Sequence, residues 1–370
     1  MKRPTVTAAL MRQTNHPLEL TELELEAPRR GEVEVEIGAS GICHSDLSVL
    51  KGALTNPLPA VLGHEGAGTV VALGEGVEGV AEGDRVTLSW MAQCGHCFYC
   101  QRLQPVLCTE GMSGMLRGTL PDGSTRFRLD GQPVYHMAGL GTFSQRVVVP
   151  VEAIVPIPRD FPMAQAALLG CGVLTGFGAA ANTARIQPGE SVAVVGCGGV
   201  GLNAIQGARI SGATVIIAID PRQERLDLAR ALGATATFRP EQDPVRRVRE
   251  LTGGRGADAV LEVAGLPQTI SDAVRMARPG GRVVIVSAPA KSVTLDVPVF
   301  TGVVMTEKTI RGSLYGSSTV RRDIPRLVSL YESRELRLDE LVTATFSLDR
   351  INDALAYCAA EQGARAVIVF

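Results

Sequence analysis

The chain has 370 residues, of which 45% are hydrophobic and 20% are charged, the balance of a soluble globular protein. Its net charge of −2 excludes strong attraction to nucleic acid or to an acidic membrane surface. The length exceeds that of one compact core, so two domains are expected. The N-terminus lacks the apolar run of a signal peptide, and we find no span long enough to cross a bilayer. We therefore expect the eight cysteines in a reducing cytoplasm, where clustered thiols bind metal more often than they pair.

The first half of the chain has the pattern of a β-rich domain. Apolar and charged residues alternate over Leu18–Leu25 and Val33–Ile37, with the period of half-buried strands. Glycine and proline recur up to about residue 160, which indicates irregular loops between the strands. This pattern predicts an all-β, barrel-like region whose loops can carry ligand residues.

Within this region, the segment Gly41–Gly66 has the residues of a metal site. Cys43 as a thiolate and His64 as a neutral imidazole are ligands that suit Zn²⁺, and Ser45 is placed to contact a molecule at an open coordination position. The best candidate for a third ligand is Cys171, far downstream between two glycines. On spacing alone, ordinary buried thiols and a loop histidine remain an alternative.

A second group of cysteines has the spacing Cys-x2-Cys-x2-Cys-x7-Cys, and its members are Cys94, Cys97, Cys100 and Cys108. Four thiolates complete a tetrahedral shell with no position for a substrate, so we predict a structural zinc site. His96 is then a loop residue rather than a ligand. Iron–sulfur proteins use similar spacings, but proline commonly follows their last cysteine, and Thr109 stands here.

After Pro158 the pattern changes to alternating strands and helices. The apolar strand Ser191–Val195 leads into a loop with glycines at Gly196, Gly198, Gly199 and Gly201, and a second apolar strand ends at Asp220. A glycine loop between a strand and a helix, with an acid about twenty residues later, is a dinucleotide-binding fingerprint. Backbone N–H groups can approach a pyrophosphate at the helix N-terminus. Asp220 would accept from the adenosine ribose and repel a 2′-phosphate, which favours NAD over NADP.

Further strands are expected over residues 257–263, 281–286 and 309–315, with helical segments between them. This alternation predicts a parallel, doubly wound sheet. Other helical patterns cover residues 164–181, 324–335 and 351–361. Residues 315–370 are too few for a third domain and are expected to return to the first.

The order of these motifs resembles the zinc-dependent medium-chain alcohol dehydrogenases, and the likeness extends over essentially the whole chain to Arg365–Phe370. The resemblance implies an α/β protein with a β-rich, GroES-like catalytic domain (1–172, completed by 315–370) and a Rossmann dinucleotide-binding domain (173–314). Segments 111–143 and 308–343 resemble a bacterial branch related to formaldehyde and aryl alcohol dehydrogenases. That branch includes forms that hold their nicotinamide cofactor permanently.

The resemblance also implies a role for each candidate site residue. Cys43, His64 and Cys171 correspond to the ligands of a catalytic zinc, Glu65 lies behind the metal, Asp46 orients His64, and Ser45 takes the proton of the alcohol. Cofactor contacts are implied for His44, Thr175, Gly196, Gly198, Gly199, Val200, Gly201, Asp220, Arg225 and Arg365. The wall of an apolar alcohol pocket is implied for Leu54, Trp90, Met112, Met137 and Leu314.

Two departures from the family pattern bear on the chemistry. Many relatives carry a histidine where Ser48 stands, so proton release requires another route, such as the cofactor ribose or His44. The glutathione-adduct branch carries acidic residues where this chain has Gly52–Pro59, which contains none. This difference disfavours a glutathione adduct as the substrate.

The sequence therefore predicts a zinc-dependent alcohol dehydrogenase that transfers hydride between NAD and a primary alcohol, aromatic or medium-chain aliphatic, giving the aldehyde. It further predicts two zinc ions per chain and a cytoplasmic homodimer or homotetramer without nucleic-acid or membrane partners. A thiol-adduct formaldehyde dehydrogenase of the S-hydroxymethylglutathione type and an alcohol dehydrogenase with permanently bound cofactor are the alternatives. A sensor that has lost catalysis has no support, because the three ligands, the serine and the fingerprint are all present.

Overall fold

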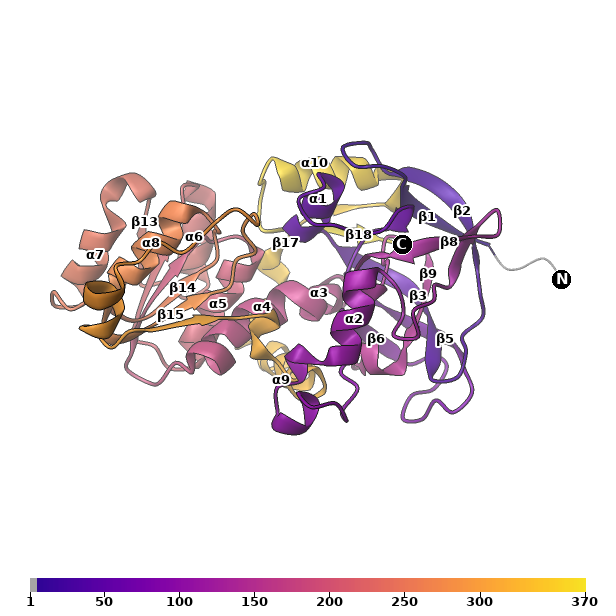
Figure 1. The fold of residues 1–370 in the computed structure, drawn as a ribbon, viewed down its shortest axis with the longest axis horizontal. Coiled ribbons are helices and arrows are strands. Elements are labelled where there is room, and N and C mark those ends of the chain that lie inside the picture. The colour runs from indigo at the N-terminus through magenta and orange to yellow at the C-terminus, as the bar shows by residue number, and fades with distance from the viewer. Residues whose placement is uncertain (1–4) are drawn as a thin grey trace. The chain divides into compact units, whose positions relative to one another are not determined.

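The computed structural model describes residues 5–370, and the chain forms two compact units, whose elements are labelled in Figure 1. The first unit contains the chain up to Cys171 together with Thr319–Ser329 and Leu341–Phe370. The second contains Gly172–Ser318 and Leu330–Glu340. The segment Leu330–Glu340 thus packs with the second unit, although the division made from the sequence places it with the first.

The first unit contains a closed barrel and a seven-stranded sheet. The barrel order is β1 (Thr5–Met11), β2 (Glu19–Leu25), β7 (Phe127–Leu129), β8 (Gln132–His136) and β4 (Ala60–Val61). The sheet order is β10 (Ile154–Pro156), β6 (Arg85–Leu88), β5 (Glu65–Leu73), β3 (Glu32–Gly41), β18 (Arg365–Val369) and β17 (Val342–Phe346), and β9 (Arg146–Pro150) also pairs with β3. The predicted β-rich region is confirmed, with short helices between its strands.

The register of this sheet brings the candidate metal residues to one end of it. Strand β3 lies between β5 and β18, so that Gly41 pairs with Glu65 on one side and with Val367 on the other. Cys43 follows β3 and precedes helix α1 (His44–Leu50), and His64 immediately precedes β5. A Cβ atom at Gly41 would lie 2.3 Å from Glu65 Oε2. Glycine at this position therefore allows the Glu65 carboxylate to reach the end of β3.

The core of the first unit is a cluster of buried apolar side chains from the barrel and the sheet, among them Leu10, Val61, Phe127 and Phe143. Helices α2 (Thr109–Arg117) and α3 (Met163–Leu168) belong to the same unit. Near the C-terminus, α10 (Ile351–Ala359) contacts both α1 and β18 (Figure 1). The last part of the chain thus completes the first unit, next to the end of β3.

The second unit is built on a six-stranded sheet in which every neighbouring pair is parallel. The order is β13 (Ala236–Phe238), β12 (Val215–Ile219), β11 (Ser191–Val195), β14 (Ala257–Glu262), β15 (Ala277–Ile285) and β16 (Thr309–Gly312). The helices that follow the strands are α5 (Gly199–Ile210), α6 (Gln223–Ala231), α7 (Pro244–Leu251) and α8 (Pro267–Met276). This is the predicted doubly wound sheet. Strand β13 was not predicted, because three residues carry too little periodicity.

One continuous helical stretch, Met163–Ala184, is long and apolar enough to cross a membrane by length and composition alone, although the sequence analysis found no such span. It alternates α-helix with π-helical turns at Leu169–Val173 and Ala179–Ala184. The helical pattern predicted over residues 164–181 is confirmed, and the stretch extends a few residues beyond it. Most of its apolar window, 78%, is buried inside the protein, as in the core helix of a globular domain. Helix α9 (Val320–Glu332) follows later in the chain.

Candidate metal centre and dinucleotide site

Four side chains of the first unit form a buried cluster with the donor types of a metal site: Cys43, His64, Glu65 and Cys171. Their ligand atoms all lie within 4.8 Å of one another. Zn²⁺ binds thiolate, imidazole and carboxylate ligands in tetrahedral geometry. Within the described residues, neither buried Glu65 oxygen accepts a hydrogen bond, and only Oε1 pairs with a cation, Arg365; a metal ion nearby would also compensate Oε2. The residues present therefore fit a zinc ion.

Cys171 reaches this cluster from the π-helical turn Leu169–Val173. A Cβ atom at the preceding Gly170 would lie 2.2 Å from the carbonyl oxygen of Leu88 on β6. The glycine thus lets the helix approach the sheet closely enough for the thiol to join the cluster. Single π-helical turns within α-helices are frequent at functional sites.

Asp46 connects the two segments that carry Cys43 and His64. Its Oδ2 atom accepts the N–H of Cys43 at 2.8 Å, and its Oδ1 atom accepts the N–H of Gly63 at 3.2 Å. Oδ1 also lies 3.2 Å from His64 Nδ1, so an Nδ1–H donor directed at the carboxylate leaves Nε2 of the imidazole to bind metal. The structure therefore places Asp46 where it can orient His64.

The buried charges shift the pKa values of the cluster. A hydrogen bond with Cys171 lowers the pKa of Cys43 well below its ordinary value, and the same bond raises the pKa of Cys171. Burial lowers the pKa of His64, but Asp46 and Cys43 together outweigh burial, and the net pKa lies well above its ordinary value. Burial raises the pKa of Glu65 to about 7, although Arg365 opposes this shift. A metal ion would displace the protons that these groups share.

Two other predicted residues lie beside the cluster. Ser45 Oγ is 3.8 Å from Cys43 Sγ. The buried guanidinium of Arg365 donates to the carbonyl oxygen of Ile42 and pairs with Glu65 Oε1, each at 3.3 Å. The sequence did not predict this ion pair, because the two residues lie in distant segments. His44, predicted as a cofactor contact, is exposed at the start of α1.

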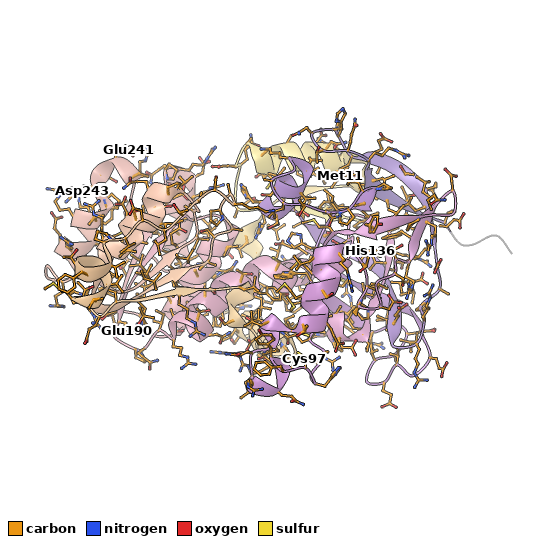
Figure 2. The ribbon with its side chains drawn as sticks, viewed as in Figure 1. Met11, Cys97, His136, Glu190, Glu241 and Asp243 are labelled. Carbon is orange, nitrogen blue, oxygen red and sulfur yellow. The ribbon has the colours of Figure 1, made fainter. Side chains whose placement is uncertain are left out.

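The second cysteine group also converges, and the ligand atoms of Cys94, Cys97, Cys100 and Cys108 lie within 4.8 Å of one another. Cys97, which is labelled in Figure 2, has its sulfur 4.0 Å from that of Cys108. Four thiols at this distance fit a second, closed zinc site. His96 Nε2 lies 2.7 Å from Glu110 Oε1, so this imidazole has a partner outside the four-cysteine shell.

The second unit carries the glycine loop between β11 and α5. A Cβ atom at Gly201 would lie 1.8 Å from the carbonyl oxygen of Gly196, so this turn requires glycine. A Cβ atom at Gly198 would meet nothing within 4 Å, which leaves an open space where α5 begins. Free N–H groups at a helix N-terminus bind phosphate. The loop therefore fits the pyrophosphate of a dinucleotide.

Asp220, the predicted ribose acceptor, directly follows β12 beside this loop and is 2% exposed. Its Oδ2 atom accepts the N–H of Cys197 at 2.8 Å, and its Oδ1 atom accepts the N–H of Arg222 at 2.9 Å. Arg225 Nη1 lies 3.9 Å from Oδ2. The carboxylate thus also supports the glycine loop, a role that the sequence pattern did not indicate.

The remaining predicted cofactor contacts lie where two helices of the second unit meet. Thr175 is on α4 (Leu174–Gly178), and Val200 is in the first turn of α5. A Cβ atom at Gly176 would lie 2.0 Å from the carbonyl oxygen of Val200. The two helices therefore pack closely at this point, next to Gly199.

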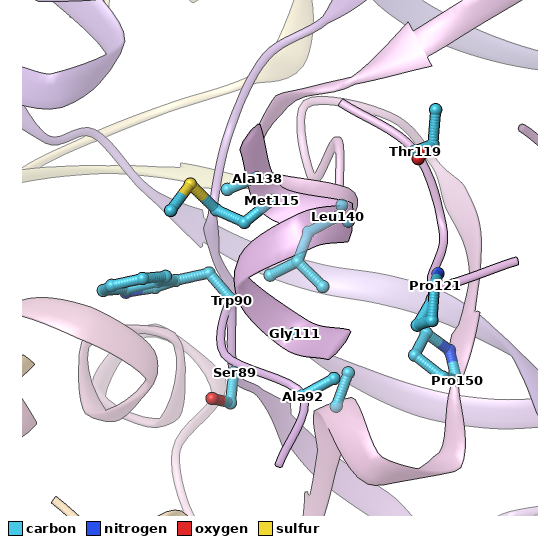
Figure 3. Close-up of a pocket in the computed structure, with 13 residues that line it drawn as sticks. Ser89, Trp90, Ala92, Gly111, Met115, Thr119, Pro121, Ala138, Leu140 and Pro150 are labelled. Carbon is cyan, nitrogen blue, oxygen red and sulfur yellow. The ribbon is translucent and has the colours of Figure 1, made fainter. Parts of the chain in front are cut away.

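A cavity of about 20 Å³ lies next to Trp90, between α2 and the segment that follows β6 (Figure 3). It is large enough for about one water molecule. Among the described residues, Trp90 is the only member of the predicted alcohol pocket that lines this cavity, and Met115 lines it instead of Met112. Met115 follows Gly111 by one helical turn and shares its face, whereas Met112 is rotated away.

The other three predicted wall residues lie elsewhere, and the proposed alcohol pocket stays a prediction. Met137 is buried in the core cluster of the first unit. Leu54 and Leu314 are exposed.

A Rossmann-type unit and a β-rich unit with a buried cysteine–histidine cluster define the class of zinc-binding dehydrogenases. Residues 29–159 match the family model of the alcohol dehydrogenase GroES-like domain, and residues 199–333 match that of the zinc-binding dehydrogenase domain. The chain belongs to the zinc-dependent medium-chain alcohol dehydrogenase family.

Three similar proteins span nearly the whole chain. An NDMA-dependent alcohol dehydrogenase of Amycolatopsis methanolica is 40% identical over 94% of each chain. The solved structure of an alcohol dehydrogenase zinc-binding domain protein from Burkholderia ambifaria is 35% identical, with a TM-score of 0.95 over 99% of each chain. The benzyl alcohol dehydrogenase of Acinetobacter calcoaceticus is 32% identical, with a TM-score of 0.94 over 99% of each chain.

Proposed function

We propose that this alcohol dehydrogenase uses zinc and NAD to convert primary alcohols, aromatic or medium-chain aliphatic, to aldehydes. The observation that carries the proposal is the buried cluster of Cys43, His64 and Cys171, whose ligand atoms lie within 4.8 Å of one another. Glu65 instead pairs with Arg365, so the three ligands leave one tetrahedral position for an alcohol. The likeness to a benzyl alcohol dehydrogenase supports an aromatic substrate.

When bound, zinc would lower the pKa of an alcohol hydroxyl and NAD⁺ would accept the hydride. The residues of the chain orient the reactants and move the proton. The two cysteines would neutralise the charge of a bound zinc ion, and Asp46 holds His64 in an orientation that would let Nε2 bind it. Ser45, which lies beside Cys43, is the first acceptor of the alcohol proton. With Ser48 in the position where relatives carry histidine, we assign the next transfer to the exposed His44.

An alcohol panel tests this proposal. We expect kcat/KM to rise from ethanol to hexanol and benzyl alcohol, because each buried methylene contributes about 0.8 kcal/mol, or roughly fourfold. Trp90 should crowd the carbon next to the hydroxyl and disfavour 2-butanol, and Trp90→Ala should relax this preference. If ethanol or 2-butanol were the best of the four, the pocket assignment would fail. If no alcohol were oxidised by the zinc-loaded protein, the proposed function itself would fail.

A second candidate is an alcohol dehydrogenase that keeps its nicotinamide cofactor bound between turnovers. The likeness to an NDMA-dependent alcohol dehydrogenase favours it. Purified protein would then carry about one NAD(H) per chain and oxidise benzyl alcohol with NDMA as the acceptor without added NAD. Turnover that depends on free NAD, by protein that carries no nucleotide, would exclude this form.

We also propose a cytoplasmic homo-oligomer. All eight cysteines are free in the structure, which suits a reducing compartment. The π-helical turn Val299–Val304 exposes Val299 and Phe300, and it precedes β16, the last strand of its sheet. A second copy would cover this apolar surface and the unpaired edge together. Sedimentation at micromolar concentration tests this, and Phe300→Glu should then shift the protein to the monomer.

A further inference from the structure

Glu262 ends β14 where the strand order of the second unit reverses. It pairs with Val195, the last residue of β11. From β11 the chain continues through α5 to β12, and from β14 it continues through α8 to β15, on the other side of the sheet centre. In sheets of this type, ligands bind outside the carboxyl ends of the strands at this switch point. Glu262 is therefore at the strand end that borders the expected dinucleotide crevice.

The Glu262 carboxylate is fully buried and accepts four hydrogen bonds. Its Oε1 atom accepts the N–H groups of Ala264 at 3.0 Å and Gly265 at 2.8 Å, and the hydroxyl of Thr269 at 2.8 Å. Its Oε2 atom accepts the hydroxyl of Ser287 at 2.5 Å. One side chain thus holds the loop after β14, the start of α8 and the segment after β15.

The main chain of Glu262 strengthens the same arrangement. Its carbonyl oxygen accepts the N–H groups of Val286 at 2.8 Å and Ser287 at 3.2 Å. A Cβ atom at Gly196 would lie 3.0 Å from the nitrogen of Ala264. The dinucleotide loop therefore packs against the backbone that Glu262 fixes, and a shift of that backbone would alter the shape of the crevice.

We propose that Glu262 is a positioning residue for the nicotinamide half of the dinucleotide. The proposal rests on the proposed use of NAD. Asp220 directly follows β12, on one side of the glycine loop, so the adenosine half belongs on the β12 side. The other half of the dinucleotide then extends over β14 and β15, whose exit loops Glu262 holds. The sequence analysis did not single out Glu262.

Binding of NAD⁺ and of AMP, measured by calorimetry on the zinc-loaded protein, separates this role from a general structural one. Glu262→Ala leaves the N–H groups of Ala264 and Gly265 without their acceptor, so NAD⁺ should bind roughly tenfold more weakly. AMP, which occupies the adenosine half alone, should bind within about twofold of wild type. Glu262→Gln keeps one acceptor oxygen and should retain most of the NAD⁺ affinity.

Asp258→Asn is the matched control, because Asp258 lies near the other end of β14, where it accepts from Ser191 and pairs with Arg278. It should leave both affinities unchanged. If Glu262→Ala does not fold, the double variant Thr269→Val, Ser287→Ala removes both hydroxyl donors and should likewise weaken NAD⁺ alone. Equal losses of NAD⁺ and AMP, or no loss of either, would overturn the positioning role. All variants are first freed of any bound nucleotide; if wild-type protein in that state bound neither NAD⁺ nor AMP, the proposed use of NAD would fail instead.

Discussion

Replacing Asp46 by asparagine tests how the metal cluster is held together. In the folded protein the carboxylate accepts hydrogen bonds from the N–H groups of Cys43 and Gly63 and faces His64 Nδ1. An asparagine amide has one acceptor oxygen and one donor nitrogen. If the oxygen serves Cys43, the NH₂ group faces the N–H of Gly63 and forces His64 into the tautomer whose Nε2 carries a proton. If the oxygen serves His64, the N–H of Cys43 loses its acceptor.

Either orientation leaves at least one buried donor without a partner, which costs about 1–3 kcal/mol of unfolding free energy. Loss of the residue that orients a ligating histidine typically lowers metal affinity about 10–100-fold. We therefore expect Asp46→Asn to lose zinc to a competing chelator at a concentration that wild type tolerates. Its kcat/KM for benzyl alcohol should fall in parallel, and excess zinc should restore part of it.

The matched control is Asp84→Asn in the same unit. Asp84 Oδ2 accepts the N–H of Ala81 at 2.8 Å, the same kind of carboxylate–backbone bond three residues apart, but it lies outside both cysteine groups. This variant should keep zinc and activity. The orienting role would be refuted if Asp46→Asn matched wild type in zinc retention, in urea unfolding and in kcat/KM. The assignment of His64 as a ligand, which depends on that role, would fail with it.

Three other outcomes are expected. Cys97→Ser should release one zinc ion per chain and lower the thermal midpoint, because a closed zinc site contributes folding free energy, while turnover should change little. Metal analysis, a thermal scan and a turnover assay check this. Asp220→Ser should raise kcat/KM for NADP relative to NAD, since it removes a negative charge beside Arg225, and an unchanged ratio would contradict the assignment. Burial lowers the pKa of His136 (labelled in Figure 2) to about 4 from its ordinary 6.5. Above pH 6.5 this imidazole is neutral in both the folded and the unfolded chain. As the pH falls towards 4, only the unfolded chain binds the proton, so up to about 3 kcal/mol of the free energy of unfolding is lost. Urea unfolding over this pH range should show a smaller loss in His136→Gln.

The parts of the site that the sequence predicted are those with local spacing. Cys94, Cys97 and Cys100 lie three residues apart, so one short loop brings them together whatever the rest of the fold does. The glycine loop likewise lies between a strand and the helix that follows it, and local turn geometry defines it. For Cys43 and Cys171 the sequence offered only residue types, and spacing alone left ordinary buried thiols as an alternative. Only the resemblance to a family assigned the two cysteines to one metal site.

Strand register determines the contacts that the sequence missed. Glu262 reads in the sequence as a charged residue at the end of an apolar strand. Its pairing with Val195 depends on two strands that are separated in the chain by three α-helices and two other strands. Arg365 reads as the start of a C-terminal strand, yet β18 pairs with β3, and this brings its guanidinium to Glu65. Both carboxylates lie at the ends of strands, where one residue of register shift would turn them to the opposite face. The chemistry of the two sites therefore depends on sheet pairings that no local pattern encodes.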